Sequence, residues 1–132
     1  MTSTNPVHTA GNAVPPLDSE LEGLLDDLAG VHPGIDLIRD GLRLVALDRH
    51  TVDMTQTLVA VLAGGSDGLN LINTIGQVIA RLADADTNPA LRTLPLDVQK
   101  TARREGQNAA YWLADPELHQ TASETSAAID GT

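Results

Sequence analysis

The stretch that decides the fold covers residues 35–63 and reads IDLIRDGLRLVALDRHTVDMTQTLVAVLA. Apolar residues follow a seven-residue repeat along it, which is typical of a helix that packs against other helices. The members of this repeat are Ile35, Ile38, Leu42, Val45, Val52 and Val59. Two polar residues, Arg49 and Gln56, interrupt the repeat. Polar residues inside an apolar seam can set register or oligomeric state, so the interruptions indicate a partner or self-association.

A second apolar stripe runs beside the first. It consists of Leu44, Leu47, Met54, Leu58 and Val61. The two stripes together cover more than half of the helix circumference, so we expect the helix to contact neighbours on two sides. We predict that the second stripe, together with Arg49, forms an interface with a protein partner or with a second copy of the chain.

The length of this helix is also informative. A continuous helix over residues 35–63 would be about 45 Å long, whereas a compact chain of this size has a radius of gyration of about 14 Å. Either the helix bends or it reaches out to a partner. Gly41 and the β-branched cluster at Thr51-Val52 are two weak points along it. The sequence leaves open whether the helix is continuous.

Helices are predicted on both sides of this stretch. Gly64-Gly65 ends the long helix, and a helix over about residues 66–83 follows after a link short enough to form an antiparallel hairpin. Its predicted buried face consists of Leu69, Ile72, Ile75, Ile79 and Leu82. Further helices are expected over about residues 17–29 and 97–114, with a short one through about residue 123.

The predicted fold is therefore all-α. A helical hairpin over about residues 35–83 with flanking helices would form a four-helix bundle or an open helical array. Residues 1–16 are predicted to be a disordered arm, residues 17–123 a single helical domain, and residues 124–132 a flexible tail.

The composition narrows the class of protein. With 132 residues, one Trp, one Tyr and no Phe, the chain has the size of one domain and a core of Leu, Ile, Val and Ala. The absence of cysteine excludes disulfide scaffolds and thiolate zinc sites. The net charge of −10 repels phosphate, so we expect no direct nucleic-acid binding. We also expect no membrane span and a cytoplasmic protein, with secretion without a conventional signal peptide as the alternative.

No group of side chains has the pattern of a catalytic or ligand-binding site. Four histidines are present, but none has a second nitrogen ligand within a helical turn, as a zinc site would require. Paired carboxylates such as Asp26-Asp27 lie near helix ends without the apolar setting of an acid–base pair. We therefore expect no enzymatic activity, no cofactor and no metal.

Lys100, Arg103 and Arg104 form a basic patch with helical spacing. It is either a solvated face that pairs with the acidic helix over residues 17–29, in the same molecule or a second copy, or a site for an acidic partner or a phosphate.

The segment Tyr111-Trp112-Leu113-Ala114-Asp115 lies near the end of a predicted helix that follows a helical hairpin. Its Tyr-x-x-x-Asp spacing resembles the C-terminal export signal of type VII secretion substrates, which are small, acidic helical-hairpin proteins of actinobacteria and their relatives. The turn predicted for the hairpin reads Gly64-Gly65-Ser66, where that family usually has Trp-x-Gly. The resemblance implies that Tyr111 and Asp115 form a recognition pair for export. Read from the residues alone, Tyr111 and Trp112 anchor the last helix on the core.

Three functions follow from these observations, in order of preference. The first is a non-enzymatic helical protein-interaction module, such as an adaptor, an inhibitor or an assembly accessory, with a homo-oligomer expected. The second is a secreted protein similar to type VII substrates. The third is an acidic decoy that occupies a nucleic-acid-binding protein.

Overall fold

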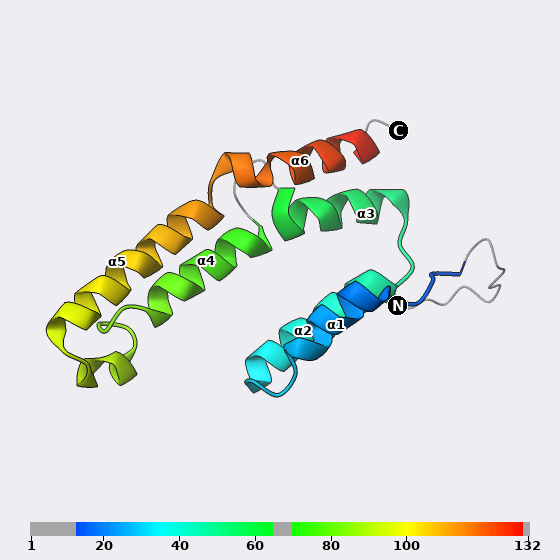
Figure 1. Ribbon diagram of the computed structural model, residues 1–132. Helices are drawn as coiled ribbons and strands as arrows, with labels where there is room; N and C mark the ends of the chain where they lie inside the picture. The colour runs from blue at the N-terminus through cyan, green and yellow to red at the C-terminus, as the bar shows by residue number, and fades with distance from the viewer. Residues whose placement is uncertain (1–12, 65–69, 131–132) are drawn as a thin grey trace. The chain divides into compact units, whose positions relative to one another are not determined.

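The computed structural model describes residues 13–64 and 70–130 (Figure 1). These residues are all-α, as predicted, and no strand occurs among them. They belong to two compact units that divide between His50 and Thr51. The prediction of a single domain over residues 17–123 stays a prediction, and the predicted N-terminal arm falls largely outside the described residues.

The first unit contains two helices, α1 (Ser19–Asp27) and α2 (Pro33–Leu47). The carboxylate of Asp18 caps α1 by accepting the N–H of Leu21 at 3.1 Å. Gly30 turns the chain between the helices with a φ of 82°, a left-handed conformation that favours glycine. An ion pair between Asp26 and Arg43, at 3.5 Å, joins α1 to α2.

The long helix predicted over residues 35–63 is broken. Helix α2 ends at Leu47, and α3 (Val52–Val59) begins after four residues that include Thr51, the weak point expected from the sequence. The Thr51 hydroxyl accepts the N–H of Met54 at 3.1 Å and so starts a new helix. Gly41, the other weak point, lies inside α2 without interrupting it.

The second unit pairs helices differently from the predicted hairpin. Helix α3 continues into a π-helical turn, η1 (Ala60–Gly64), and both pack along α6 (Pro116–Asp130). Helix α4 (Leu71–Leu82) packs along α5 (Leu96–Leu113) instead of along α3, although its contacts include η1 (Figure 1). The expected turn at Gly64-Gly65-Ser66 lies mostly outside the described residues.

Glycines set the distance between α4 and α5. Gly76 and Gly106 are buried in this seam. A Cβ on Gly76 would stand 3.1 Å from the Cα of Ala110, and a Cβ on Gly106 would stand 2.5 Å from the Cβ of Ala83. The two backbones can therefore approach this closely only because both positions lack a side chain.

Helix α6 is longer than predicted. Asp115 accepts the N–H of Glu117 at 2.9 Å, and Pro116 occupies the first position, where its fixed φ suits a helix start. The helix continues to Asp130, so the predicted end near residue 123 was wrong, and residues 124–130 are helical where a flexible tail was predicted. Glu124 to Ile129 lack a helix breaker, and Ser126 contacts α3, which explains the extension.

The described part of the chain buries few large apolar side chains. Leu25, 3% exposed, and Ala110, 7% exposed, are its buried apolar residues, and no large side chain is fully buried. Three polar residues, Asn70, His119 and Ser126, are as deeply buried. Leu25 and Ala110 belong to the expected core of Leu, Ile, Val and Ala, but the remaining buried contacts in the described residues involve glycine and polar side chains, and many large apolar side chains are exposed.

Candidate protein-interaction surface

Helix α4 has two distinct stripes. The stripe that faces α5 is built from small residues, Gly76, Ala80 and Ala83. Beside it lies an apolar stripe spaced by four, three and four residues, the spacing of a coiled-coil seam. This stripe consists of Leu71, Ile75, Val78 and Leu82. Because Val78 is 50% exposed and Leu82 is 59% exposed, the outer part of the stripe is open to solvent.

Helix α5 adds apolar residues to the same side of the hairpin. Successive residues of a helix are rotated by about 100° around its axis. In an antiparallel pair, residues of the two helices that are rotated by the same angle from the line of contact lie on the same side of the pair. When the rotation is measured from Gly76 in α4 and from Gly106 in α5, the α4 stripe and Trp112 lie on the same side of the hairpin. Trp112 is 65% exposed. We call this surface the apolar hairpin face, defined by Val78, Ile79, Leu82, Val98 and Trp112, all of them exposed.

The opposite side of the hairpin is polar. It carries the predicted basic patch together with Arg81. Arg103 lies 3.6 Å from the carboxylates of both Asp84 and Asp86, and Arg104 lies 3.1 Å from Glu105. Within the described residues, Arg103 and Arg104 of the patch therefore form ion pairs with carboxylates of the same hairpin. Its exposed side chains remain a solvated face, and a role in binding an acidic ligand stays a prediction.

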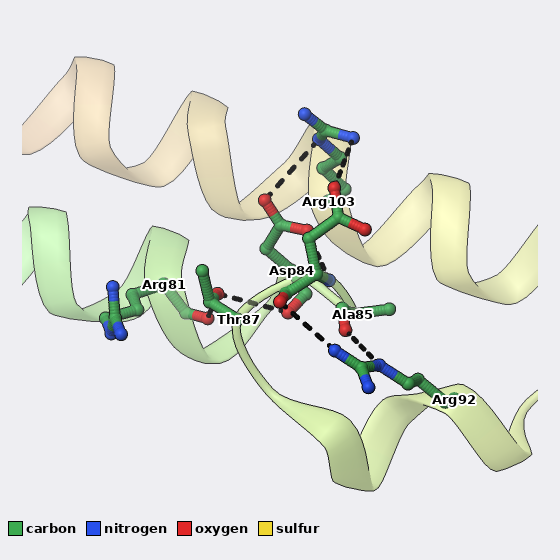
Figure 2. Close-up of polar contacts among 7 residues, drawn as sticks. Arg81, Asp84, Ala85, Thr87, Arg92 and Arg103 are labelled. Atoms are coloured by element: carbon green, nitrogen blue, oxygen red, sulfur yellow. Dashed lines mark hydrogen bonds and ion pairs between the residues drawn. The ribbon is translucent and has the colours of Figure 1, made fainter.

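The connection between α4 and α5 is held by side chains that bind backbone oxygens (Figure 2). The Thr87 hydroxyl donates to the carbonyl of Arg81 at 2.6 Å, and the Asn88 amide donates to the carbonyl of Leu82 at 2.8 Å. Arg92, which belongs to the short helix η2 (Pro89–Thr93), donates to the carbonyl of Ala85 at 2.8 Å. These bonds satisfy carbonyls at the end of α4 and define the geometry of the hairpin.

The interface predicted from the second stripe is divided by the break after Leu47. Its first members, Leu44, Leu47 and Arg49, belong to the first unit, where Leu44 is 66% exposed and Leu47 is 37% exposed. The other members belong to the second unit and are Met54, Leu58 and Val61. Met54 and Val61 are exposed and Leu58 is half-buried. The six residues do not lie on one continuous helix, and their role in binding stays a prediction.

Tyr111 and Asp115 lie on either side of the junction between α5 and α6. Tyr111 is 73% exposed in the last turn of α5, so it does not anchor the helix on a core. Its ring meets that of Trp112 edge-on, with 6.1 Å between the centroids. Asp115 is half-buried and caps α6.

Sequence reasoning missed the glycine seam and therefore misplaced the buried face of α4. It predicted Ile79 and Leu82 as buried, but they are 36% and 59% exposed, whereas Gly76 is buried. The signal was present in the spacing of small residues, Gly76-x-x-x-Ala80 in α4 and Ala102-x-x-x-Gly106-x-x-x-Ala110 in α5. Such spacing lines small residues along one helix face and permits close packing.

Comparisons with protein-family models, with curated proteins and with solved structures gave no match to this chain. Within the described residues, every helix is either too short or too polar to cross a bilayer. Function must therefore be argued from the surface.

Proposed function

We propose that this protein is a non-enzymatic interaction module that associates with a second copy of itself through the apolar hairpin face. The observation that supports this proposal is the exposure of Val78, Leu82 and Trp112 on one side of a hairpin whose own seam consists of glycine and alanine. Contiguous apolar patches on soluble proteins commonly mark binding surfaces.

The free energy of apolar burial favours a second layer on this face. A two-helix hairpin buries one stripe of each helix and leaves the rest in water, so stable helical folds add further helices. Covering apolar surface contributes about 25 cal/mol per Å². Two hairpins that face each other would form a four-helix arrangement, and the spacing of the α4 stripe is that of helices that interdigitate.

The charges near the face favour a second copy as the partner. Although the whole chain carries a charge of −10, the hairpin turns one ionised side chain, Glu105, towards this side. Glu105 lies 3.1 Å from Arg104, and both are exposed. A two-fold axis brings a surface against itself, and the Glu105 carboxylate is already paired with Arg104 of its own chain. The contact surface of the hairpin itself therefore carries little unpaired charge.

The test is the absolute mass in solution, measured by light scattering on a size-exclusion column at two protein concentrations and at low and high salt. The expected result is a dimer that survives high salt, because an apolar contact is not screened. Val78→Asp and Leu82→Asp should give monomers, while Leu44→Asp, on the stripe of α2, should leave the dimer intact. A monomeric wild-type protein would overturn self-association. A dimer lost with Leu44→Asp alone would move the interface to the stripe that contains Leu44 and Leu47.

A second candidate function is secretion of the type VII class, with Tyr111 and Asp115 as the export pair. The exposure of Tyr111 at the end of the second helix of a hairpin favours it, since a receptor could reach the ring. Replacement of Tyr111 by Ala should abolish export in a host that has this system, while Trp112→Ala should not. Unchanged export of the Tyr111→Ala variant would exclude this function.

A further inference from the structure

His119 is buried between two backbone carbonyls. It belongs to α6 and is 6% exposed. Its Nδ1 lies 2.7 Å from the carbonyl oxygen of Ala63, and its Nε2 lies 2.6 Å from the carbonyl oxygen of Leu113. A carbonyl oxygen can only accept a hydrogen bond. A neutral imidazole has one N–H and an imidazolium has two, so both contacts can be hydrogen bonds only when the ring is protonated.

The two carbonyls lie where a positive charge is favourable. Ala63 belongs to the last turn of η1, and Leu113 is the last residue of α5. Carbonyl groups at the end of a helix lack intrahelical donors and carry the negative end of the helix dipole. The ring of His119 thus joins the ends of two helices, and through them it links the α3–α6 pair to the α4–α5 pair.

The ionisable side chains on the elements around this ring lie mostly away from it. The segment η1 has none, and α4 has only Arg81, near its far end. The others include Asp53 in α3, Asp115 at the junction, Glu117 and Glu124 in α6, and six residues of α5, of which only Tyr111 lies within two turns of Leu113: Asp97, Lys100, Arg103, Arg104, Glu105 and Tyr111. All of these are exposed except Asp115, whose carboxylate already accepts the N–H of Glu117. Asp67 lies outside the described residues.

The rest of the contact between α6 and α3–η1 is also rich in polar side chains. The Ser123 hydroxyl donates to the carbonyl of Gly64 at 2.7 Å. The Gln56 amide donates to the Ser126 hydroxyl at 2.9 Å, and Ser126 lies 3.2 Å from the carbonyl of Gln56. Directional hydrogen bonds therefore contribute to this contact. The loss of one donor therefore has a large effect on it.

We propose that His119 is a proton-operated latch that holds α6 on η1 and on the end of α5. When the ring is protonated, both nitrogens donate and α6 is held. When the ring loses its proton, a nitrogen lone pair faces a carbonyl oxygen at hydrogen-bond distance and α6 loosens. The stabilisation is therefore present in the protonated state of the ring and lost in its neutral state. Histidine is suited to this role because it changes charge near neutral pH.

The first test measures hydrogen–deuterium exchange of the α6 amides at about pH 5 and about pH 8, a range that spans the usual titration of histidine. The protection factors, corrected for the intrinsic pH dependence of exchange, are expected to fall on the order of tenfold or more at the higher pH, since a charge-assisted hydrogen bond is lost. His119→Gln should remove this difference. His50→Gln is the matched control, because the His50 Nε2 contacts a carbonyl, that of Val45 at 2.7 Å, in the other unit.

The second test needs no variant and so remains informative if His119→Gln fails to fold. The ¹⁵N resonances of the His119 ring report which nitrogens carry hydrogen. At about pH 5 both ring nitrogens should be protonated and both should show scalar coupling to a carbonyl carbon across the hydrogen bond. A ring with one unprotonated nitrogen at that pH, or α6 protection that does not change with pH, would overturn the latch.

Discussion

The backbone at Gly106 lies so close to Ala83 that a methyl group on residue 106 would stand 2.5 Å from the Ala83 Cβ. The added carbon would meet a short side chain on the opposite helix, which cannot rotate away. Helices α4 and α5 would have to move apart, and the connection that caps α4 through Thr87 and Asn88 resists that movement.

We therefore expect Gly106→Ala to destabilise the second unit by about 1–3 kcal/mol, the usual cost of overpacking, in spite of the better helix propensity of alanine. The matched control is Gly41→Ala in α2, where an added Cβ meets nothing within 4 Å and should stabilise its helix by about 0.5–1 kcal/mol. Thermal unfolding followed by circular dichroism, together with amide exchange in each unit, measures both effects. If Gly106→Ala and Gly41→Ala changed the stability relative to the wild type by the same amount, the close approach of α4 and α5 at Gly106 would be contradicted.

Thr51 starts α3 and so maintains the break in the long stretch. Thr51→Ala should lower the free energy of unfolding of the second unit by about 1 kcal/mol, because the N–H of Met54 loses its acceptor. Thr51→Ser keeps the oxygen and should cost only a few tenths of a kcal/mol. Urea denaturation of the two variants gives the comparison. The same loss in both would show that the methyl group of Thr51, and not its hydroxyl, matters.

Trp112 and Tyr111 are adjacent, exposed aromatic residues that turn to different sides of α5. Within the proposed dimer, Trp112→Ala should raise the dissociation constant at least about tenfold, since buried tryptophans are frequent hot spots. Tyr111→Ala, which removes a ring that is 73% exposed, should leave the dissociation constant nearly unchanged. Sedimentation equilibrium measures both constants. A larger effect from Tyr111→Ala would place the interface on the polar side of the hairpin.

Several helix ends were correctly predicted because they depend on a few neighbouring residues. The helices expected over about residues 17–29 and 97–114 are observed as α1 and α5, and local caps at Asp18 and Asp115 set where α1 and α6 begin. The weak point at Thr51-Val52 lies at the observed break. The end of α6 was predicted too early, near residue 123. No helix breaker stands there, and the residue that orders the last turns, Gln56, is distant in sequence.

The candidate surface was only partly predictable. An exposed apolar helix face was expected on residues 44–61, and many of those side chains are exposed. The apolar hairpin face was not foreseen, because Ile79 and Leu82 were predicted to be buried in a hairpin with the preceding helix. Likewise, nothing in the sequence near His119 indicates that the carbonyls of Ala63 and Leu113 meet its ring.

The sequence by itself determined the all-α character of the chain and most of its helix starts, since periodicity, caps and glycine stops act over a few residues. Only the tertiary structure decided which helices pair. That choice depends on how closely two backbones can approach, and Gly76 and Gly106 permit an approach that bulkier residues prevent. A reading based on hydrophobicity places leucine and isoleucine in the core and overlooks glycine. In this hairpin Gly76 and Gly106 are buried, and Leu82 and Ile79 are left on the surface.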